Sequence, residues 1–189
     1  MDTIRTFIAV AIAPDVKQRA AELIQRLRAS RADVKWVEPH NMHLTLKFLG
    51  DVLATNTAAV CDAVTEVAQG FAPLSLSFRG AGAFPDANRP RTVWLGLEHG
   101  AQELTELALT LEELLADLGY PKEDRSFHPH LTLGRVRNAG PALKELTHFI
   151  RENAEFDAGV SEVREVIVFA SHLDRSGPTY EALGRAPLG

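Results

Sequence analysis

Short runs of apolar and β-branched residues alternate along the chain with longer stretches whose apolar residues recur every three or four positions. The first run, Arg5–Ile12, predicts a buried strand. Pro14-Asp15 is a helix-start signal, and the leucines and alanines that follow predict a helix over Val16–Ser30. The pattern continues with strands expected at 33–37, 42–49 and 74–78, a helix expected at 55–68, and Gly50-Asp51 expected to end the strand before it. The first part of the chain therefore has the predicted order β-α-β-β-α-β.

The same order then begins again. We expect strands at 91–97, within 127–136, at 165–171 and at the edge position 179–183, and helices at 101–118 and 141–152. Arg5-Thr6 recurs as Arg91-Thr92 after 86 positions, and the tetrapeptide His-Leu-Thr-Leu recurs after 87. Two independent markers with nearly the same period indicate an internal duplication.

The repeat predicts the fold class. We expect a single α+β domain over 1–189 with two pseudo-symmetric lobes, each a mainly antiparallel sheet with helices on its outer side, and an active-site cleft between them. The halves are expected at about 5–90 and 91–175, with a C-terminal strand in 176–189. A doubly wound nucleotide-binding sheet is disfavoured because neither half alternates strictly between strand and helix.

Composition narrows the possible partners. The formal net charge is −5, which does not favour long duplex nucleic acid or an anionic membrane. The apolar run 7–13 is too short to span a membrane and lacks a basic leader. The single cysteine, Cys61, suggests a reducing compartment, so we expect a cytoplasmic location. Phosphate-loop and dinucleotide fingerprints are absent from the sequence, so neither ATP nor a nicotinamide cofactor is expected.

The repeated tetrapeptide carries the candidate chemistry. Residues two apart on a strand point to the same face, so His43 and Thr45 share one side of their strand, and His130 and Thr132 share one side of theirs. If the lobes pack with approximate twofold symmetry, the four side chains meet in one cleft. One imidazole can then accept a proton while the other donates one, as displacement at a phosphodiester requires. The two hydroxyls can donate hydrogen bonds to phosphoryl oxygens.

Two alternatives come from other functional classes. His40, His43, His128 and His130 could form a metal site, although no cysteine or carboxylate completes such a cluster. The chain could also be a non-catalytic nucleotide-binding module that keeps the cleft. Intact histidines and threonines in both copies argue against a decayed site.

Beyond these arguments, the sequence resembles the RNA 2′,3′-cyclic phosphodiesterase family, also called 2′-5′ RNA ligase-like, of the two-histidine phosphoesterase superfamily. The resemblance rests on the two His-Leu-Thr-Leu motifs, the stretch Arg125–Arg135, the opening Arg5–Ala9 and the ending Gly177–Tyr180, and runs from residue 5 to about 183. It implies metal-independent hydrolysis of a 2′,3′-cyclic phosphate to a 2′-phosphate, with reversible 2′-5′ ligation as a side activity and no cofactor. The implied partners are RNA ends or nucleoside cyclic phosphates, with no membrane, and we expect a monomer.

The resemblance also implies roles for individual residues. His43 and His130 would be catalytic, and Thr45, Thr132 and Arg135 would bind phosphate. Arg135 lies five positions after His130, so only a bulge or a long reach brings it to the same face.

Other residues near the motifs extend these expectations. Phe48 and Tyr180 are candidates for stacking on a base, and Lys47 is expected at a cationic rim or in solvent. Because Arg135 and His128 make the setting of His130 more cationic, we expect His130 to have the lower pKa and His43 to be the protonated partner.

Overall fold

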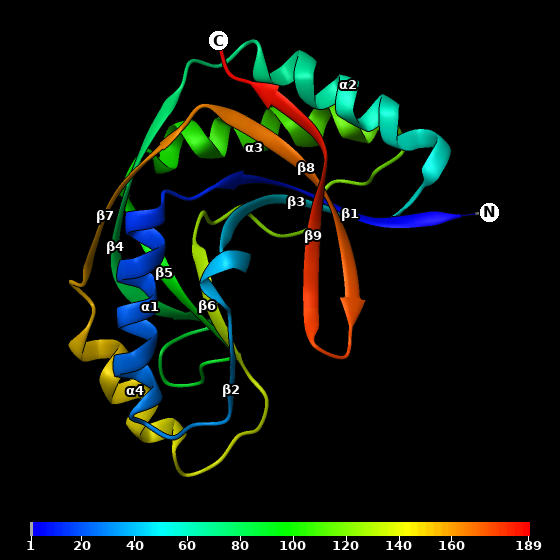
Figure 1. Ribbon diagram of the computed structural model, residues 1–189. Helices are drawn as coiled ribbons and strands as arrows, with labels where there is room; N and C mark the ends of the chain where they lie inside the picture. The colour runs from blue at the N-terminus through cyan, green and yellow to red at the C-terminus, as the bar shows by residue number, and fades with distance from the viewer. Residues whose placement is uncertain (1) are drawn as a thin grey trace.

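The computed structural model describes residues 2–189 and contains all of the predicted helices and strands (Figure 1). The helices are α1 (Pro14–Arg28), α2 (Thr57–Ala68), α3 (Ala101–Asp117) and α4 (Leu143–Glu152). The strands are β1 (Thr3–Ala11), β2 (Val34–Trp36), β3 (His43–Leu53), β4 (Leu74–Phe84), β5 (Thr92–His99), β6 (Leu131–Val136), β7 (Asp157–Val163), β8 (Glu165–Asp174) and β9 (Gly177–Pro187). Short 3-10 turns, Pro39–Asn41 and Ala54–Asn56, flank β3. No helix in this part of the chain is long and apolar enough to span a membrane.

The strands form two antiparallel sheets. One has the order β3-β1-β8-β9 and the other β2-β6-β5-β4-β7. β1 and β5 occupy equivalent places, since each lies between a motif-bearing strand and a strand from the other half of the sequence. β4 from the first half joins the second sheet, and β8 from the second half joins the first. The exchange ties the two lobes together, and the fold class expected from the sequence is confirmed.

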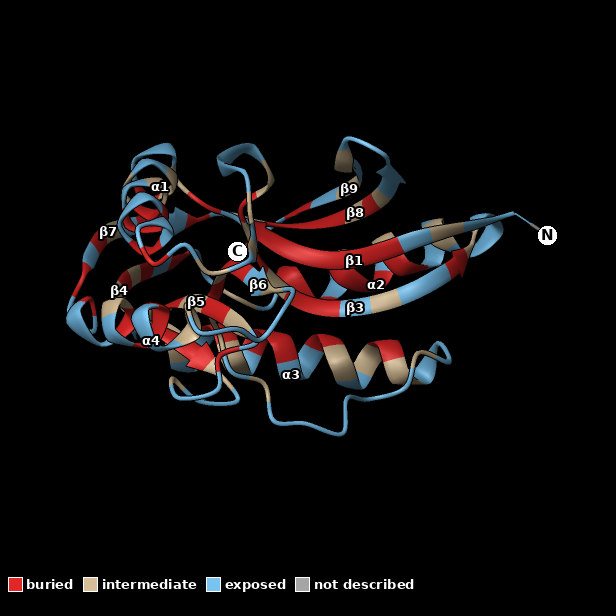
Figure 2. Ribbon diagram, turned by 90° about the horizontal axis from the view of Figure 1, so that it is seen from below, coloured by how far each residue is buried: buried red, intermediate tan, exposed pale blue. Residues whose placement is uncertain are grey.

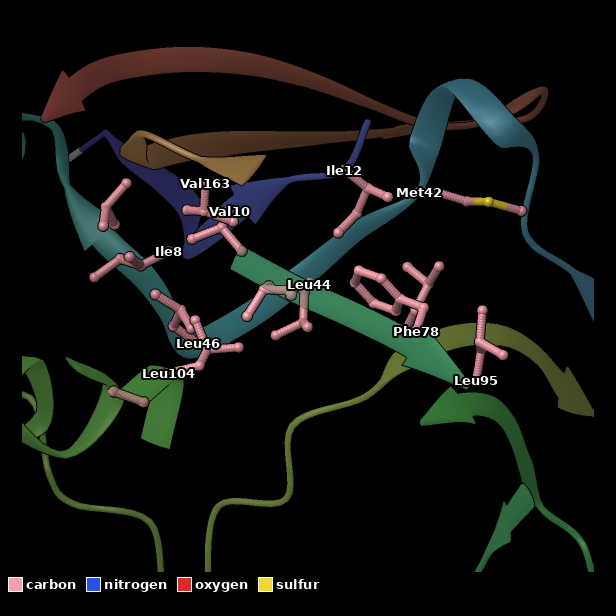
Figure 3. Close-up of a cluster of buried hydrophobic side chains, with 14 of the residues drawn as sticks. Ile8, Val10, Ile12, Met42, Leu44, Leu46, Phe78, Leu95, Leu104 and Val163 are labelled. Carbon is pink, nitrogen blue, oxygen red and sulfur yellow. The ribbon is translucent and has the colours of Figure 1, made fainter. Parts of the chain in front are cut away.

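The two lobes share one hydrophobic core. Leu44 and Leu46 of β3 and Leu131 and Leu133 of β6 are buried in the same cluster. Figure 3 shows Leu44 and Leu46 in this cluster with residues of both sheets, among them Val10. β3 and β6 contact each other. Burial of the motif leucines therefore holds the two motif strands side by side, with their polar residues on the opposite face.

The helices cover the sheets as two pairs. α1 packs against β7 and α4, and α2 packs against β9, β8 and α3. Figure 2 shows red, buried residues along one side of α1 and α3, with exposed residues on the other side. It also shows that β1 and β3 are buried at one end and more exposed at the other, which lies near the N-terminus of the chain. The helices therefore cover the outer faces of the two sheets.

Two features of the strands differ from the sequence prediction. Gly50-Asp51 does not end β3, which continues to Leu53, because Gly50 adopts a φ of 72° at a register shift opposite Thr6 and the ladder resumes beyond it. β7 was not predicted, because its seven residues include Asp157, Gly159 and a buried Ser161. The Ser161 hydroxyl accepts a hydrogen bond of 2.9 Å from the backbone amide of Ala13.

Candidate active site

Each motif is held by the same local construction. Thr45 pairs with Ala9 of β1, and Thr132 pairs with Trp94 of β5. Both threonines are half-buried, and within residues 2–189 neither hydroxyl has a hydrogen-bond partner. The two hydroxyls are therefore available to a ligand.

Both imidazoles are anchored by a backbone carbonyl two residues upstream. His43 Nδ1 lies 2.8 Å from the Asn41 carbonyl oxygen, and His130 Nδ1 lies 2.6 Å from the His128 carbonyl oxygen. Because a carbonyl can only accept, each Nδ1 carries the proton and donates it, which leaves Nε2 as a free acceptor. This gives His128 a role through its backbone, matched by Asn41 in the other lobe.

Burial sets the protonation of both rings. It lowers the pKa of His43 to about 4, against the carbonyl bond of Asn41 and with a smaller contribution from Lys17. Burial also lowers the pKa of His130 below its ordinary 6.5, with smaller contributions from Arg135 and His128. The expectation that cationic neighbours give His130 the lower pKa is wrong, because desolvation dominates and is stronger at His43.

A β-bulge brings the fifth residue after each motif histidine to the ligand face. In the pairing of β5 with β6, Leu133 has no partner, so Arg135 lies opposite Thr92 and on the side of Thr132. Arg135 donates a hydrogen bond of 3.2 Å to the Thr92 hydroxyl. β3 has the same irregularity, which skips Leu46 and places Phe48 opposite Phe7. Arg135 and Phe48 are thus structurally equivalent, and the bulge that Arg135 requires is present.

An aromatic cluster surrounds His43. Its ring stacks on Phe7 with centroids 4.7 Å apart and meets the edge of Tyr180 at 5.1 Å. Phe7 also lies 5.9 Å from Phe48, which is 56% exposed and free to receive a ligand. Phe169 completes the cluster at 5.2 Å from Phe7. Burial raises the pKa of Tyr180, and the charges of Arg135 and Arg5 oppose this, so Tyr180 lies within electrostatic reach of the second motif.

The second histidine has a different environment. His130 meets the edge of the Phe84 ring at 4.9 Å, and Phe84 packs on Trp94 at 5.3 Å. Sequence reasoning missed Phe7, Phe169 and Trp94 as parts of the site, because apolar residues on a strand give no sign of which face they occupy. The register with the motif threonines is the signal that identifies Trp94.

Two sequence expectations fail at this site. Lys47 is neither at the rim nor in solvent. It is buried, with Nζ 3.2 Å from Glu112 Oε1 and 2.9 Å from the Pro121 carbonyl oxygen. The histidines of the proposed metal cluster do not converge: across residues 2–189, no three His, Cys, Asp or Glu side chains come close enough to hold a metal ion.

Comparison with known proteins identifies a family that matches this chain. The LigT-like phosphoesterase family matches the chain twice, over residues 10–94 and 95–180. A protein of Archaeoglobus fulgidus named RNA 2′,3′-cyclic phosphodiesterase is 36% identical, over 95% of this chain and 97% of its own. One of the same name from Aquifex aeolicus is 32% identical over the full length of both chains.

The fold is also found among solved structures. E. coli LigT, in a crystal structure with 3′-AMP, has a TM-score of 0.78 and 27% identity, covering 99% of both chains. Crystal structures of LigT with ATP and with NADP+ also exist, so the absence of ATP binding stays a prediction for this chain. The family model matches two segments of the chain, and relatives more than 30% identical align over at least 95% of both chains. The chain therefore belongs to the LigT-like phosphoesterase family.

Proposed function

We propose that this protein hydrolyses 2′,3′-cyclic phosphates at RNA ends to 2′-phosphates without a metal ion. The observation that carries the proposal is the pair of carbonyl-anchored imidazoles, one in each lobe, with Nε2 free and an unbonded threonine hydroxyl beside each. The names of the relatives support the same reaction. The cytoplasmic location and the monomeric state expected from the sequence stay predictions.

The reaction assigns each group one task. One imidazole takes a proton from water as its oxygen bonds to phosphorus, and the other imidazole gives a proton to O3′ as the P–O3′ bond breaks. Thr45, Thr132 and Arg135 hold the non-bridging oxygens, on which negative charge increases in the transition state. If a 5′-hydroxyl replaces water, the same steps form a 2′-5′ linkage, which is the proposed side activity.

Phe48 is the residue that recognises the base of the nucleotide in this proposal. Phe48 lies on the ligand face, is more than half exposed and is supported from behind by Phe7. A base that stacks on it gains contact without any sequence-specific hydrogen bond. Tyr180 is the second stacking candidate, and its T-shaped contact with His43 also helps to bury that imidazole.

The test is product analysis on a short RNA that ends in a 2′,3′-cyclic phosphate. We expect conversion to a 2′-phosphate in the presence of EDTA, identified by chromatography against 2′- and 3′-phosphate standards. The His43→Ala/His130→Ala double variant is the control. Tight binding of the RNA without turnover would favour the non-catalytic module, and activity that needs added zinc would favour metal chemistry.

A further inference from the structure

A hollow of about 290 Å³ opens beside His43, on the side away from Phe48. Its walls come from the first turn of α1, the 3-10 turn before β3, and the strands β1, β8 and β9, which lie side by side in Figure 1. Asn41 fastens the 3-10 turn to β9 by donating a hydrogen bond of 3.0 Å to the Pro178 carbonyl oxygen. The hollow is therefore a built feature of the first lobe.

The polar groups of the hollow suit an anion. Lys17, His40 and Thr179 line it, and no aspartate or glutamate does. Within residues 2–189, Lys17 forms no ion pair. Lys17 and His43 line the same hollow, and the lysine charge makes a small contribution to the lowered pKa of the imidazole. In a chain of net charge −5, a hollow lined by a free lysine and no carboxylate favours a negatively charged ligand.

At the equivalent place in the second lobe, an indole ring covers the surface of the sheet. Ala11, which pairs with His43, is exposed in the hollow. The corresponding residue of β5 is Gly96, and there the indole of Trp94 fills the sheet surface. A Cβ atom on Gly96 would lie 3.2 Å from that ring, and one on Gly82 would overlap it. A ligand longer than the reacting nucleotide can therefore extend along the first lobe.

We propose that this hollow binds the phosphodiester on the 5′ side of the reacting nucleotide, with Lys17 as its cationic contact. The proposal rests on the proposed function and extends it, because it makes the enzyme distinguish an RNA end from a mononucleotide. With the terminal base on Phe48, the cyclic phosphate lies between the motifs. The chain then continues past His43 into a hollow that has room for about one phosphate and its sugar.

The experiment compares two substrates. Adenosine 2′,3′-cyclic phosphate has no 5′ phosphodiester, and the dinucleotide ApA with a terminal 2′,3′-cyclic phosphate has one. We expect the wild type to have a kcat/KM about tenfold higher on the dinucleotide, the size of one charge-assisted hydrogen bond. Lys17→Met should lower the ratio of the two kcat/KM values to about one, because any effect of the lost charge on His43 is common to both substrates, and Lys17→Arg should restore most of the ratio. Lys144→Met, which removes an exposed charge on α4, is the matched control.

Salt gives a second readout. The advantage of the dinucleotide should shrink as ionic strength rises in the wild type and should not exist in Lys17→Met, because the contact is between opposite charges. Equal kcat/KM on the two substrates in the wild type would overturn the inference and leave the proposed function standing. An equal loss on both substrates in Lys17→Met would mean that Lys17 acts only on His43, and would also overturn it. Hydrolysis of neither substrate by the wild type would overturn both proposals.

Discussion

The two half-sites share their reacting groups and their local construction, and they differ in several of the residues around them. In both, a carbonyl two residues upstream holds Nδ1, the threonine two residues downstream lies on the same face as the histidine, and a bulge turns the fifth residue after the histidine inward. That fifth residue is Phe48 in the first lobe and Arg135 in the second. Its cross-strand partner is Phe7 in one lobe and Thr92 in the other. The bulge residue that faces the ligand is therefore aromatic in the first half-site and cationic in the second.

The difference indicates how a duplicated fold comes to bind an asymmetric substrate. A terminal nucleotide has a flat apolar base at one end and an anionic phosphate at the other. Aromatic residues suit the first and a guanidinium suits the second. The aromatic side also buries its histidine more deeply, so two chemically identical imidazoles acquire different pKa values. Substitutions in each half-site test this division between a side for the base and a side for the phosphate, beginning with the groups that the half-sites share.

Loss of either histidine should have the largest effect. His43→Ala and His130→Ala should each lower kcat by roughly 10² to 10⁴, the range for a positioned acid or base. The variants should remain folded, since the histidines lie on the strand faces opposite the buried motif leucines. Steady-state kinetics on a cyclic-phosphate RNA, together with melting curves, measure this. A fully active variant, or one that has lost its fold, would contradict the assignment.

A substrate with an activated 3′ leaving group distinguishes the imidazole that acts as the acid from the one that acts as the base. An activated 3′ leaving group needs little protonation, so it should rescue the alanine variant of the acid and not that of the base. Because the pKa of His43 is the lower of the two, His43 is neutral where His130 is protonated, so we expect rescue of His130→Ala. Rescue of His43→Ala alone would restore the assignment made from the sequence.

Removal of the cationic fifth residue should have the next largest effect. Arg135→Ala should lower kcat/KM by about 10² to 10³, because it removes a donor to the charge that increases in the transition state. Arg135→Lys should recover only part, since an ammonium group lacks the paired donors of a guanidinium. Arg137→Ala, just beyond β6, serves as the matched control. Activity equal to wild type in Arg135→Ala would leave Arg135 as a surface charge.

The aromatic fifth residue should matter less. Phe48→Ala should reduce kcat/KM by about tenfold on a substrate with a base, the energy of one stacking contact. A ribose 2′,3′-cyclic phosphate without a base should be hydrolysed equally by the wild type and by the variant. If Phe48→Ala lowers kcat/KM equally on substrates with and without a base, Phe48 maintains the shape of the cleft and does not stack on the base.

The pH profile separates the two histidines. One imidazole must be protonated and the other neutral, so kcat/KM should follow a bell with its maximum between a pKa of about 4 and one below 6.5, on the acid side of neutrality. Tyr180→Ala admits water to His43, which raises that pKa and moves the acid limb to higher pH. Phe84→Ala should instead move the alkaline limb toward higher pH. A maximum above pH 7, or the same shift in both variants, would contradict the division.

Chelation should have no effect. Within residues 2–189 neither half-site gathers a set of metal ligands, and the proposed steps use only protons and hydrogen bonds. Initial rates with and without EDTA should agree. Loss of activity on chelation that zinc restores would return His40 and His128 to consideration as ligands.

The local features of this protein can be predicted from its sequence. Periodicity predicts the helices and strands, because each must bury one face. The repeat of His-Leu-Thr-Leu predicts two equivalent strands with a histidine and a threonine on one side and leucines on the other. The parity of residues on a strand even shows that Arg135 needs a bulge to face the cleft.

The differences between the half-sites arise from tertiary contacts. Which strands exchange between the lobes, how Phe7, Phe169 and Tyr180 enclose His43, and where Lys47 is buried all depend on contacts between residues far apart in the sequence. The pKa order of the histidines depends on them too, because desolvation reflects everything packed around a ring, whereas the sequence shows only its neighbours along the chain. The reacting groups are local and repeated, so the sequence could show them. Their environments are non-local, so only the folded chain could.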